Sequence, residues 1–269
     1  MKEPSILNDI RSMLSGFSET ERKFAEYVLR EKDLIYKSIT MATEESEVGY
    51  GTIIRFCQKL KCKGFQDFKI KLALEQSQKE PEIPRGEDTF LLTICKDIRT
   101  VNAAIDPALF DKAAKLLVPA KKILVIGSGG SYAQAWDLCY RLTRIGFDAA
   151  AEADAHMQAI RAATLGSGDI LIAVSFSGST KNILHAVKQG KRVKAAVIAI
   201  TNYEPSPLSA AADLTFCLKL RSQVLDAEIG SKIPVSFLIE LLCNKLFKSA
   251  PNAVDALSLT AHSVSDELF

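Results

Sequence analysis

The sequence predicts a two-domain protein with an all-α N-terminal domain and an α/β C-terminal domain built on a parallel sheet. Its length of 269 residues exceeds the usual size of a single domain. The first part of the chain has only helical patterns, whereas short apolar runs alternate with helical segments in the second part. Two prolines, a glycine and alternating charges between residues 77 and 87 mark the break. We therefore expect an N-terminal domain at 1–78, a linker and connecting helix at 79–106, and a C-terminal domain at 107–269.

Overall composition excludes several classes of protein. The net charge of +2 gives no global field that would attract nucleic acid, so any basic surface has to be local. The six cysteines are scattered without a CxxC pair, which indicates reduced thiols and neither a disulfide framework nor a zinc site. The N-terminus has no apolar signal region, and no apolar stretch reaches membrane-spanning length. We expect a cytoplasmic protein with no membrane partner, no metal and no cofactor.

The N-terminal domain is predicted to consist of short helices. The first covers residues 5–14 and is stopped by Gly16, and Ser18 with Glu21 forms a capping box that begins the second helix. Further helices are expected over residues 38–45, 50–60 and 65–74. Because only four residues separate the helices at 38–45 and 50–60, this pair has the spacing of a helix-turn-helix unit.

The helix predicted at 50–60 has the composition of a DNA-reading helix. One face is an apolar stripe formed by Ile53, Phe56, Cys57 and Leu60. The other face includes arginine and glutamine, which pair bidentately with guanine and adenine edges in the major groove. Between residues 55 and 71 there are six basic side chains and one acidic side chain, a pattern typical of phosphate contacts. The candidate DNA-binding residues are Tyr50, Gly51, Thr52, Arg55, Gln58, Lys59, Lys61, Lys63 and Lys69. The alternative is an ordinary three-helix packing unit whose lysines form a solvated face.

The C-terminal domain is predicted to begin with helices at 89–104 and 108–117 and to continue with alternating strands and helices. The alternation implies right-handed βαβ units and a parallel sheet. The expected strands are residues 123–126, 148–151, 170–174, 196–200 and 214–218.

A hydroxyl-rich loop, Ser175-Phe176-Ser177-Gly178-Ser179-Thr180, follows the strand predicted at 170–174 and precedes a helical segment. A strand that turns into a helix through such residues presents backbone N–H groups at the positive end of the helix dipole. The loop therefore suits a phosphate, with hydroxyls as further donors and Gly178 permitting close approach. The alternative is an ordinary loop whose serines cap the helix.

A second loop, Gly127-Ser128-Gly129-Gly130-Ser131-Tyr132, follows the first predicted strand. It does not match a dinucleotide-binding fingerprint, because Tyr132 occupies the third small position. If the two strands are neighbours, both loops face one crevice, which suits a phosphomonoester with a polyhydroxy body. Asp154, His156 and Glu228 are further candidates, although a lone histidine such as His156 is more often a structural hydrogen-bonding group.

These motifs resemble those of two known families. The segment 175–180 is similar to the S-x-S-G-x-T signature of the SIS (sugar isomerase) domain, and the segments 52–60 and 63–69 resemble the helix-turn-helix of RpiR-type bacterial transcriptional regulators. The resemblance implies a doubly wound, flavodoxin-like sheet of five parallel strands and assembly as a homodimer or homotetramer. It also implies a bound phosphosugar, for which the candidate residues are Ser128, Gly129, Ser131, Ser175, Ser177, Gly178, Ser179, Thr180, His156 and Glu228.

Three residues depart from the family patterns. Glu47 stands where the turn usually carries glycine, Phe176 replaces a glutamine common in SIS isomerases, and Ser179 replaces a frequent glutamate. The last two changes remove polar groups from the pocket rim, which weakens the case for isomerase chemistry.

The leading hypothesis is a regulator, not an enzyme, whose affinity for double-stranded operator DNA responds to a bound sugar phosphate. The alternative is a sugar-phosphate isomerase or lyase, in which Glu228 would be the general base and His156 a ring-opening acid. A third reading is a sugar-phosphate-binding scaffold that acts through protein contacts. The identity of the sugar, the operator and the direction of regulation stay open.

Overall fold

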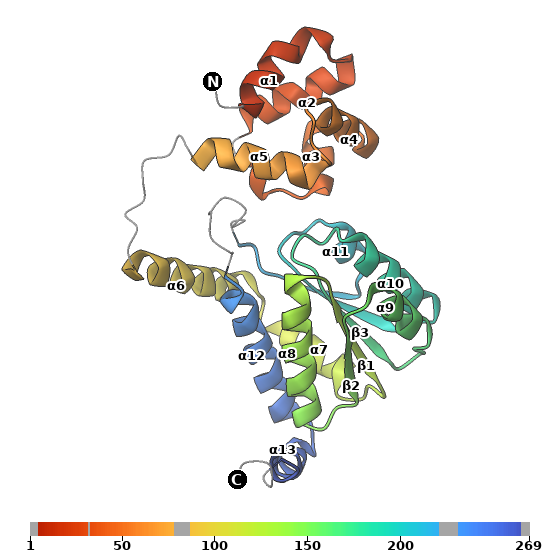
Figure 1. The fold of residues 1–269 in the computed structure, drawn as a ribbon. Helices are drawn as coiled ribbons and strands as arrows, with labels where there is room; N and C mark the ends of the chain where they lie inside the picture. The colour runs from red at the N-terminus through yellow and green to blue at the C-terminus, as the bar shows by residue number, and fades with distance from the viewer. Residues whose placement is uncertain (1–4, 32, 78–86, 221–230, 265–269) are drawn as a thin grey trace. The chain divides into compact units, whose positions relative to one another are not determined.

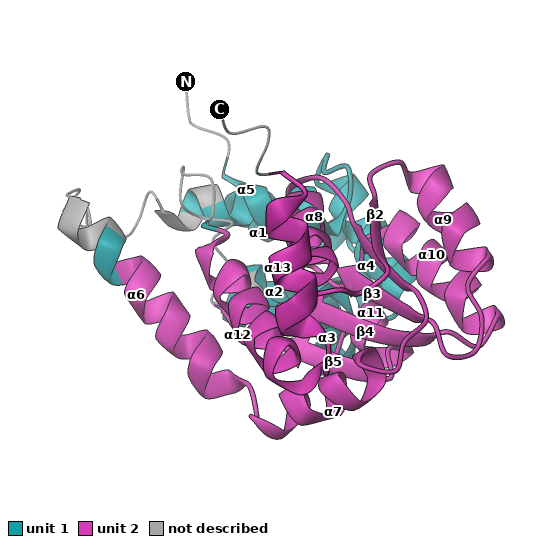
Figure 2. Ribbon diagram, turned by 90° about the horizontal axis from the view of Figure 1, so that it is seen from below, with its two compact units in different colours: residues 1–92, 221–231 teal, residues 93–220, 232–269 magenta. Residues whose placement is uncertain are grey.

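The computed structural model describes residues 5–31, 33–77, 87–220 and 231–264. It divides into two compact units, shown in different colours in Figure 2: one runs to Leu92, and the other contains Thr93–Leu220 and the chain from Lys232 onward. Most of the linker predicted between the domains, residues 78–86, lies outside the described residues.

The first unit is helical, as predicted, and its helices begin and end close to the expected positions (Figure 1). Ser18 is the N-cap of the second helix, where its side chain accepts from the Glu21 backbone N–H and the Glu21 carboxylate accepts from the Ser18 N–H at 2.8 Å. The predicted capping box is therefore confirmed. The elements are α1 (Ile6–Met13), η1 (Leu14–Gly16), α2 (Glu19–Arg30), η2 (Leu34–Tyr36), α3 (Ile39–Ser46), α4 (Tyr50–Lys59) and α5 (Phe65–Ser77).

An aromatic cluster fixes α4 in the first unit. Phe56, on the apolar stripe of α4, is fully buried and lies at the centre of the cluster. Its ring centroid is 5.0 Å from that of Phe17, 5.1 Å from that of Phe24 and 5.8 Å from that of Phe68. The pairs with Phe24 and Phe68 are edge-to-face, an arrangement that favours one orientation of the rings. The cluster therefore sets the rotation of α4 and leaves its polar face outward.

The second unit alternates strands and helices and contains the five predicted strands (Figure 1). Its elements are α6 (Glu87–Ala104, which begins in the first unit), α7 (Ala108–Leu117), β1 (Ile123–Gly127), α8 (Gly130–Arg144), β2 (Ala149–Glu152), α9 (Ala155–Ala163), β3 (Ile170–Val174), α10 (Lys181–Arg192), β4 (Ala196–Thr201), α11 (Pro207–Ala211), β5 (Leu214–Cys217), α12 (Ile233–Ser249) and α13 (Ala253–His262).

The sheet is parallel throughout, with the strand order β2-β1-β3-β4-β5. Alternate residues of each strand point to opposite faces, so Val125 and Ile172 pack with α7, α8 and α12, whereas Leu124 and Leu171 pack with α9, α10 and α11. Both faces are covered, which confirms the doubly wound arrangement. The chain leaves β1 toward β2 on one side and returns to β3 on the other, so the strand order reverses between β1 and β3. In open α/β sheets, ligands bind outside the carboxyl ends of the strands at such a point.

Candidate functional site

The turn between α3 and α4 contains a strained glutamate. Glu47 adopts φ 54° and ψ 34°, the left-handed region in which glycine is favoured. This conformation lets the Val48 N–H reach the Thr43 carbonyl at 3.2 Å and lets the buried Val48 side chain turn into the core. The Glu47 side chain lies on the surface, where it pairs with Lys23. The turn is therefore of the glycine type even though the residue is not glycine.

We predict that Glu47→Gly stabilises the first unit, because glycine removes the Cβ that is strained at positive φ. The suitable reference is Glu47→Ala, which removes the ion pair with Lys23 but keeps the Cβ. The glycine variant should unfold at a temperature roughly 4 °C above the alanine variant. Thermal unfolding followed by circular dichroism measures the difference. Equal unfolding temperatures would mean that the turn carries no strain.

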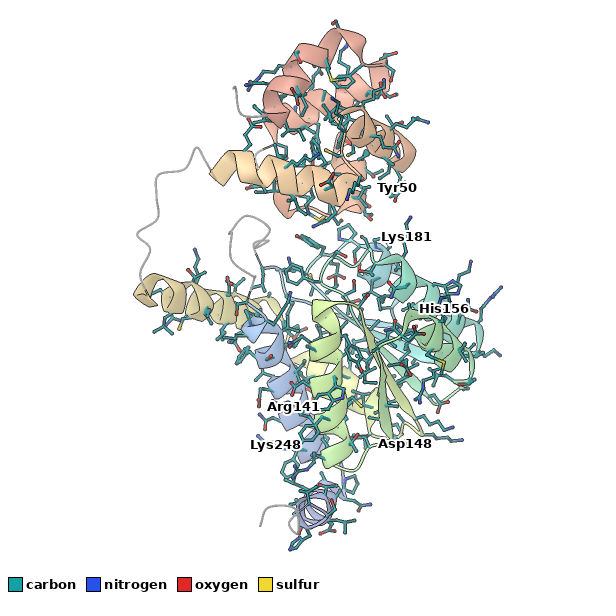
Figure 3. The ribbon with its side chains drawn as sticks, viewed as in Figure 1. Tyr50, Arg141, Asp148, His156, Lys181 and Lys248 are labelled. Atoms are coloured by element: carbon teal, nitrogen blue, oxygen red, sulfur yellow. The ribbon has the colours of Figure 1, made fainter. Side chains whose placement is uncertain are left out.

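The exposed face of α4 presents the polar residues that the sequence pattern singled out. Arg55 and Gln58 are exposed, and Arg55 Nη2 donates to Thr52 Oγ1 at 3.1 Å, which aligns these two side chains on one face. Tyr50, labelled in Figure 3, is 54% exposed at the start of the helix. The N-cap Gly49 offers no side chain to the first amides of α4, so these N–H groups suit a phosphate. The arrangement is that of a helix able to enter a major groove.

The predicted lysines around α4 differ in their surroundings. Lys61 and Lys63 are exposed, whereas Lys59 is about half exposed and its Nζ lies 2.7 Å from the buried capping-box carboxylate of Glu21. Lys61 has φ 55° and ends α4, with its N–H donating to the Gln58 carbonyl at 2.9 Å. Lys59 therefore also has a structural role, because it ties α4 to α2.

Lys69 does not belong to the exposed basic surface, contrary to its inclusion among the predicted DNA contacts. It is 3% exposed, and its Nζ donates to the Lys37 carbonyl at 2.7 Å. Burial lowers the pKa of this amine to about 8, because the charged form loses its hydration. Lys69 follows Phe68 on the inward face of α5, so it joins α5 to η2 and is turned away from any DNA.

In the second unit, two loops lie next to each other at the carboxyl edge of the sheet. We call residues 127–131 the β1 loop and residues 175–180 the β3 loop. Their strands are paired, with Gly127 opposite Val174, and Asn182 Nδ2 donates to Ser128 Oγ at 3.4 Å between the two segments. Figure 3 labels Lys181, the first residue of α10, at this end of the sheet and Asp148 at the opposite end. The structure thus brings the two predicted loops together.

Hydroxyl groups converge within the β3 loop. Thr180 Oγ1 lies 3.1 Å from Ser175 Oγ and 3.4 Å from Ser177 Oγ, and Ser175 is buried. Ser179 is turned back onto its own loop, where its hydroxyl donates to the Ser177 carbonyl at 3.2 Å. Hydroxyls can donate to an anion without a charge of their own, so the cluster suits a phosphate oxygen.

Gly178 allows the β3 loop to lie against the segment after β4. It has φ 62°, and a Cβ at this position would lie 2.3 Å from Ser206 Oγ and 2.9 Å from Thr201 Oγ1. Its carbonyl accepts from the Leu208 N–H at 2.9 Å. No other residue type fits this combination of conformation and close approach without a shift of the surroundings.

The helices after β2 and β4 begin with a side-chain cap, whereas those after β1, β3 and β5 do not. Asp154 caps α9 by accepting from the Met157 N–H at 2.9 Å, and Ser206 caps α11. At α8 and α10 the N-cap residues, Gly129 and Thr180, make no such bond. These two helices of 15 and 12 residues begin at the two loops. At the start of α8, the Ser131 and Tyr132 N–H groups already donate to the Ser128 and Gly129 carbonyls. At α10 the Thr180 carbonyl accepts from the Leu184 N–H at 3.0 Å, so the N–H groups before Leu184 are the ones that suit a ligand at the place where the strand order reverses.

A small pocket of about 10 Å³, enough for a group the size of one water or methyl, lies beside the β1 loop. Its lining includes Lys232, whose Nζ is 5.3 Å from the Phe176 ring centroid, within the range of a cation–π contact. The end of the Lys232 side chain also approaches the β1 loop, because its Cε would lie 3.5 Å from a Cβ on Gly130. We call this the apolar pocket; it is lined by Ser131, Gln134, Val174, Phe176, Ile200, Leu218, Lys232 and Val235.

The remaining sequence candidates are not joined to the two loops. His156 is exposed near the start of α9, where Figure 3 labels it, and no hydrogen bond to either loop is present among the described residues. Glu228 lies outside the described residues. Sequence reasoning missed Asn182, Gln134 and Lys232. Of these three, only Lys232 could have been suspected from the sequence. It is the N-cap of α12, where a positive charge is unfavourable next to the helix dipole, and such a placement indicates a role other than helix stabilisation.

Comparisons with known proteins identify both parts of the chain. Residues 116–244 match the SIS domain, and residues 5–79 match the helix-turn-helix domain of the rpiR family. An uncharacterised HTH-type transcriptional regulator of Clostridium perfringens is 31% identical over 90% of this chain and 92% of its own length. The transcriptional regulator HexR of Escherichia coli is 30% identical over 80% of this chain and 78% of its own. The structure of Vibrio vulnificus NanR complexed with ManNAc-6P is similar with a TM-score of 0.87 and 29% identity, covering 98% of this chain and 99% of that one.

Proposed function

The chain belongs to the rpiR family of helix-turn-helix transcriptional regulators, and we propose that a sugar phosphate bound at its β1 and β3 loops changes its affinity for operator DNA. The first unit would read a bacterial operator with α4, and the second unit would sense the metabolite. A ligand changes DNA affinity only by binding the DNA-competent and DNA-incompetent arrangements unequally. The proposal therefore requires an effect of the sugar phosphate on DNA binding, beyond its binding to the second unit.

The observation that carries the proposal is the pair of uncapped helices at the reversal point of the sheet. The N-termini of α8 and α10 lack side-chain caps, and two serine hydroxyls, Ser175 Oγ and Ser177 Oγ, converge on Thr180 Oγ1 at the start of α10. Helix N-termini and hydroxyls are donors, and a phosphate monoester is a compact acceptor with several oxygens. The structure of the related Vibrio vulnificus NanR is of a complex with ManNAc-6P, which supports an effector of the sugar-phosphate class.

A binding role is favoured over catalysis by the residues around the loops. Aldose–ketose isomerisation needs a general base that moves a proton between adjacent carbons. Within the described part of the chain, the two loops and the lining of the apolar pocket contain no aspartate, glutamate or histidine. Phe176 takes the place of a polar group at the rim. We therefore propose a regulator and keep a sugar-phosphate isomerase or lyase as the alternative.

We also propose a homodimer or homotetramer in the cytoplasm. A two-fold dimer places two recognition helices about 34 Å apart, which matches successive major-groove faces of one operator. On α8, Trp136 and Tyr140 are 55% and 48% exposed and stacked with ring centroids 5.7 Å apart, which offers an apolar contact to a second subunit. Of the helices described, none is long and apolar enough to cross a bilayer.

The experiment combines a ligand screen with a DNA-binding measurement. Thermal unfolding of the purified chain is followed with a panel of pentose, hexose and amino-sugar phosphates, because a ligand that binds only the native form raises the unfolding temperature. Each hit is then titrated into a complex with a DNA duplex selected by the protein from a random library, and fluorescence anisotropy reports release or tighter binding. We expect at least one hit to change the Kd for DNA by about 5-fold or more. If the protein instead converts a hit at enzyme-like rates and the hit leaves the Kd for DNA unchanged, the isomerase or lyase alternative is favoured.

A further inference from the structure

The apolar pocket beside the β1 loop has features that specify the ligand further. We propose that the sugar phosphate sensed by this protein carries an N-acyl group, and that the methyl end of this group occupies the apolar pocket. The inference rests on the proposed function, because it concerns the same site and names the chemical class of its ligand.

The floor of the pocket is made by apolar side chains at the carboxyl ends of three strands. These are Val174 from β3, Ile200 from β4 and Leu218 directly after β5, and each is at most 3% exposed. Phe176 and Val235 complete the apolar lining. A sugar hydroxyl placed here would lose its water without gaining a hydrogen-bond partner, which is costly. A methyl group would instead gain from leaving water.

The rim of the pocket provides donors. Gln134 Oε1 accepts from Ser236 Oγ at 2.9 Å, so the amide nitrogen of Gln134 is the end that can donate to a ligand. The Lys232 ammonium, placed over the Phe176 ring, is the second donor. An acyl carbonyl is an acceptor and fits both groups. A free amino group on the sugar is protonated near neutral pH and would meet the like charge of Lys232.

Ser131 connects the two halves of the proposed site. It belongs to the β1 loop at the start of α8 and also lines the apolar pocket. A ligand with its phosphate at the uncapped helices therefore reaches the pocket with its sugar substituent. The apolar floor and the donor rim match an acylamino group, which combines a methyl group with a carbonyl oxygen.

The test compares matched ligands by isothermal titration calorimetry on the full chain. The ligands are the 2-acetamido, 2-amino and 2-hydroxy hexose 6-phosphates of the gluco and manno series. We expect at least one acetamido compound to bind about 10-fold or more tightly than its 2-hydroxy counterpart, because a hydrophobic pocket gives about 10- to 200-fold for a group of this size. We expect the 2-amino compound of that series to bind more weakly still.

Two variants of Phe176 test the pocket itself. Phe176→Gln should reduce the preference for the acetamido compound to less than 3-fold, whereas Phe176→Leu should keep most of it because the floor stays apolar. Ile160→Gln also replaces an apolar side chain with glutamine, on the exposed face of α9, and should leave the preference unaltered. Binding of the 2-hydroxy compound by each variant shows that the phosphate end is intact.

The outcomes separate this inference from the proposed function. If 2-hydroxy sugar phosphates bind as tightly as acetamido ones and change DNA affinity, the sensor is retained and the acyl pocket is wrong. The acyl inference would also be overturned if Phe176→Gln kept the wild-type preference for the acetamido compound over the 2-hydroxy compound. If no member of either series binds while a sugar phosphate of another class changes DNA affinity, the acyl inference fails alone. If no sugar phosphate changes DNA affinity, the proposed function fails.

Discussion

Replacement of Arg55 by alanine should lower the affinity for operator DNA by roughly 10- to 100-fold at constant salt, since a bidentate contact to a base is worth about 1–3 kcal/mol. Arg55 is exposed on α4, and its guanidinium is oriented by a hydrogen bond to Thr52 Oγ1. It belongs to a separate compact unit from the β1 and β3 loops, so the Kd for a sugar phosphate should not change. Fluorescence anisotropy with the selected duplex and calorimetry with the effector measure the two affinities.

Two further variants distinguish base reading from charge. Arg55→Lys keeps the positive charge and removes the planar fork, so most of the loss should persist. Arg192→Ala removes an exposed arginine from α10 in the second unit and should leave operator affinity nearly unchanged. Equal losses for Arg55→Ala and Arg192→Ala would show that only net charge matters. Parallel losses of DNA and sugar-phosphate affinity in Arg55→Ala would contradict the division of roles between the two units.

The double variant Ser175→Ala with Thr180→Ala should abolish the response of DNA binding to the effector. The two hydroxyls lie 3.1 Å apart at the start of α10, and a hydrogen bond to a charged group contributes about 1.5–3 kcal/mol, so loss of both should weaken effector binding by about 100-fold or more. DNA affinity without effector should stay at the wild-type value in low salt, because α4 is untouched. Titration of the effector into the DNA complex measures the response.

A matched control removes one serine and one threonine hydroxyl elsewhere in the second unit. Ser249 and Thr143 are exposed helix residues: the Ser249 hydroxyl donates to the Lys245 carbonyl, and the Thr143 hydroxyl donates to the Cys139 carbonyl at 3.0 Å and more weakly to the Ala149 carbonyl at 3.4 Å. The double variant Ser249→Ala with Thr143→Ala should respond to the effector as the wild type does. A full effector response in the Ser175→Ala and Thr180→Ala protein would place the phosphate somewhere other than the β3 loop.

The fold was predictable because its local signals agree with one another. The Ser18 and Glu21 capping box begins α2 as expected, and the apolar runs at 123–126 and 170–174 form the paired strands β1 and β3. Such features depend on residues close in sequence, which is why the pattern alone predicts them.

The prediction for Lys69 was wrong for a reason that the sequence also contained. Phe65, Phe68 and Leu72 form the inward stripe of α5, and position 69 falls on the same stripe at i+4 from Phe65. Lys69 is close in sequence to the exposed lysines, but the 3.6-residue repeat of α5 determines the face on which its side chain lies. Asn182 and Gln134 could not be found in this way, because their partners Ser128 and Ser236 are 54 and 102 positions away.

The contact of Gly178 with Ser206 and Thr201 has an evolutionary consequence. A side chain at position 178 collides with two hydroxyl-bearing residues and opposes the local backbone conformation, so one substitution there is harmful while the partners stay as they are. A substitution at position 178 of the β3 loop therefore requires simultaneous changes in the segment after β4, which contains Ser206. Among descendants of this protein, the β3 loop and the segment after β4 should vary together.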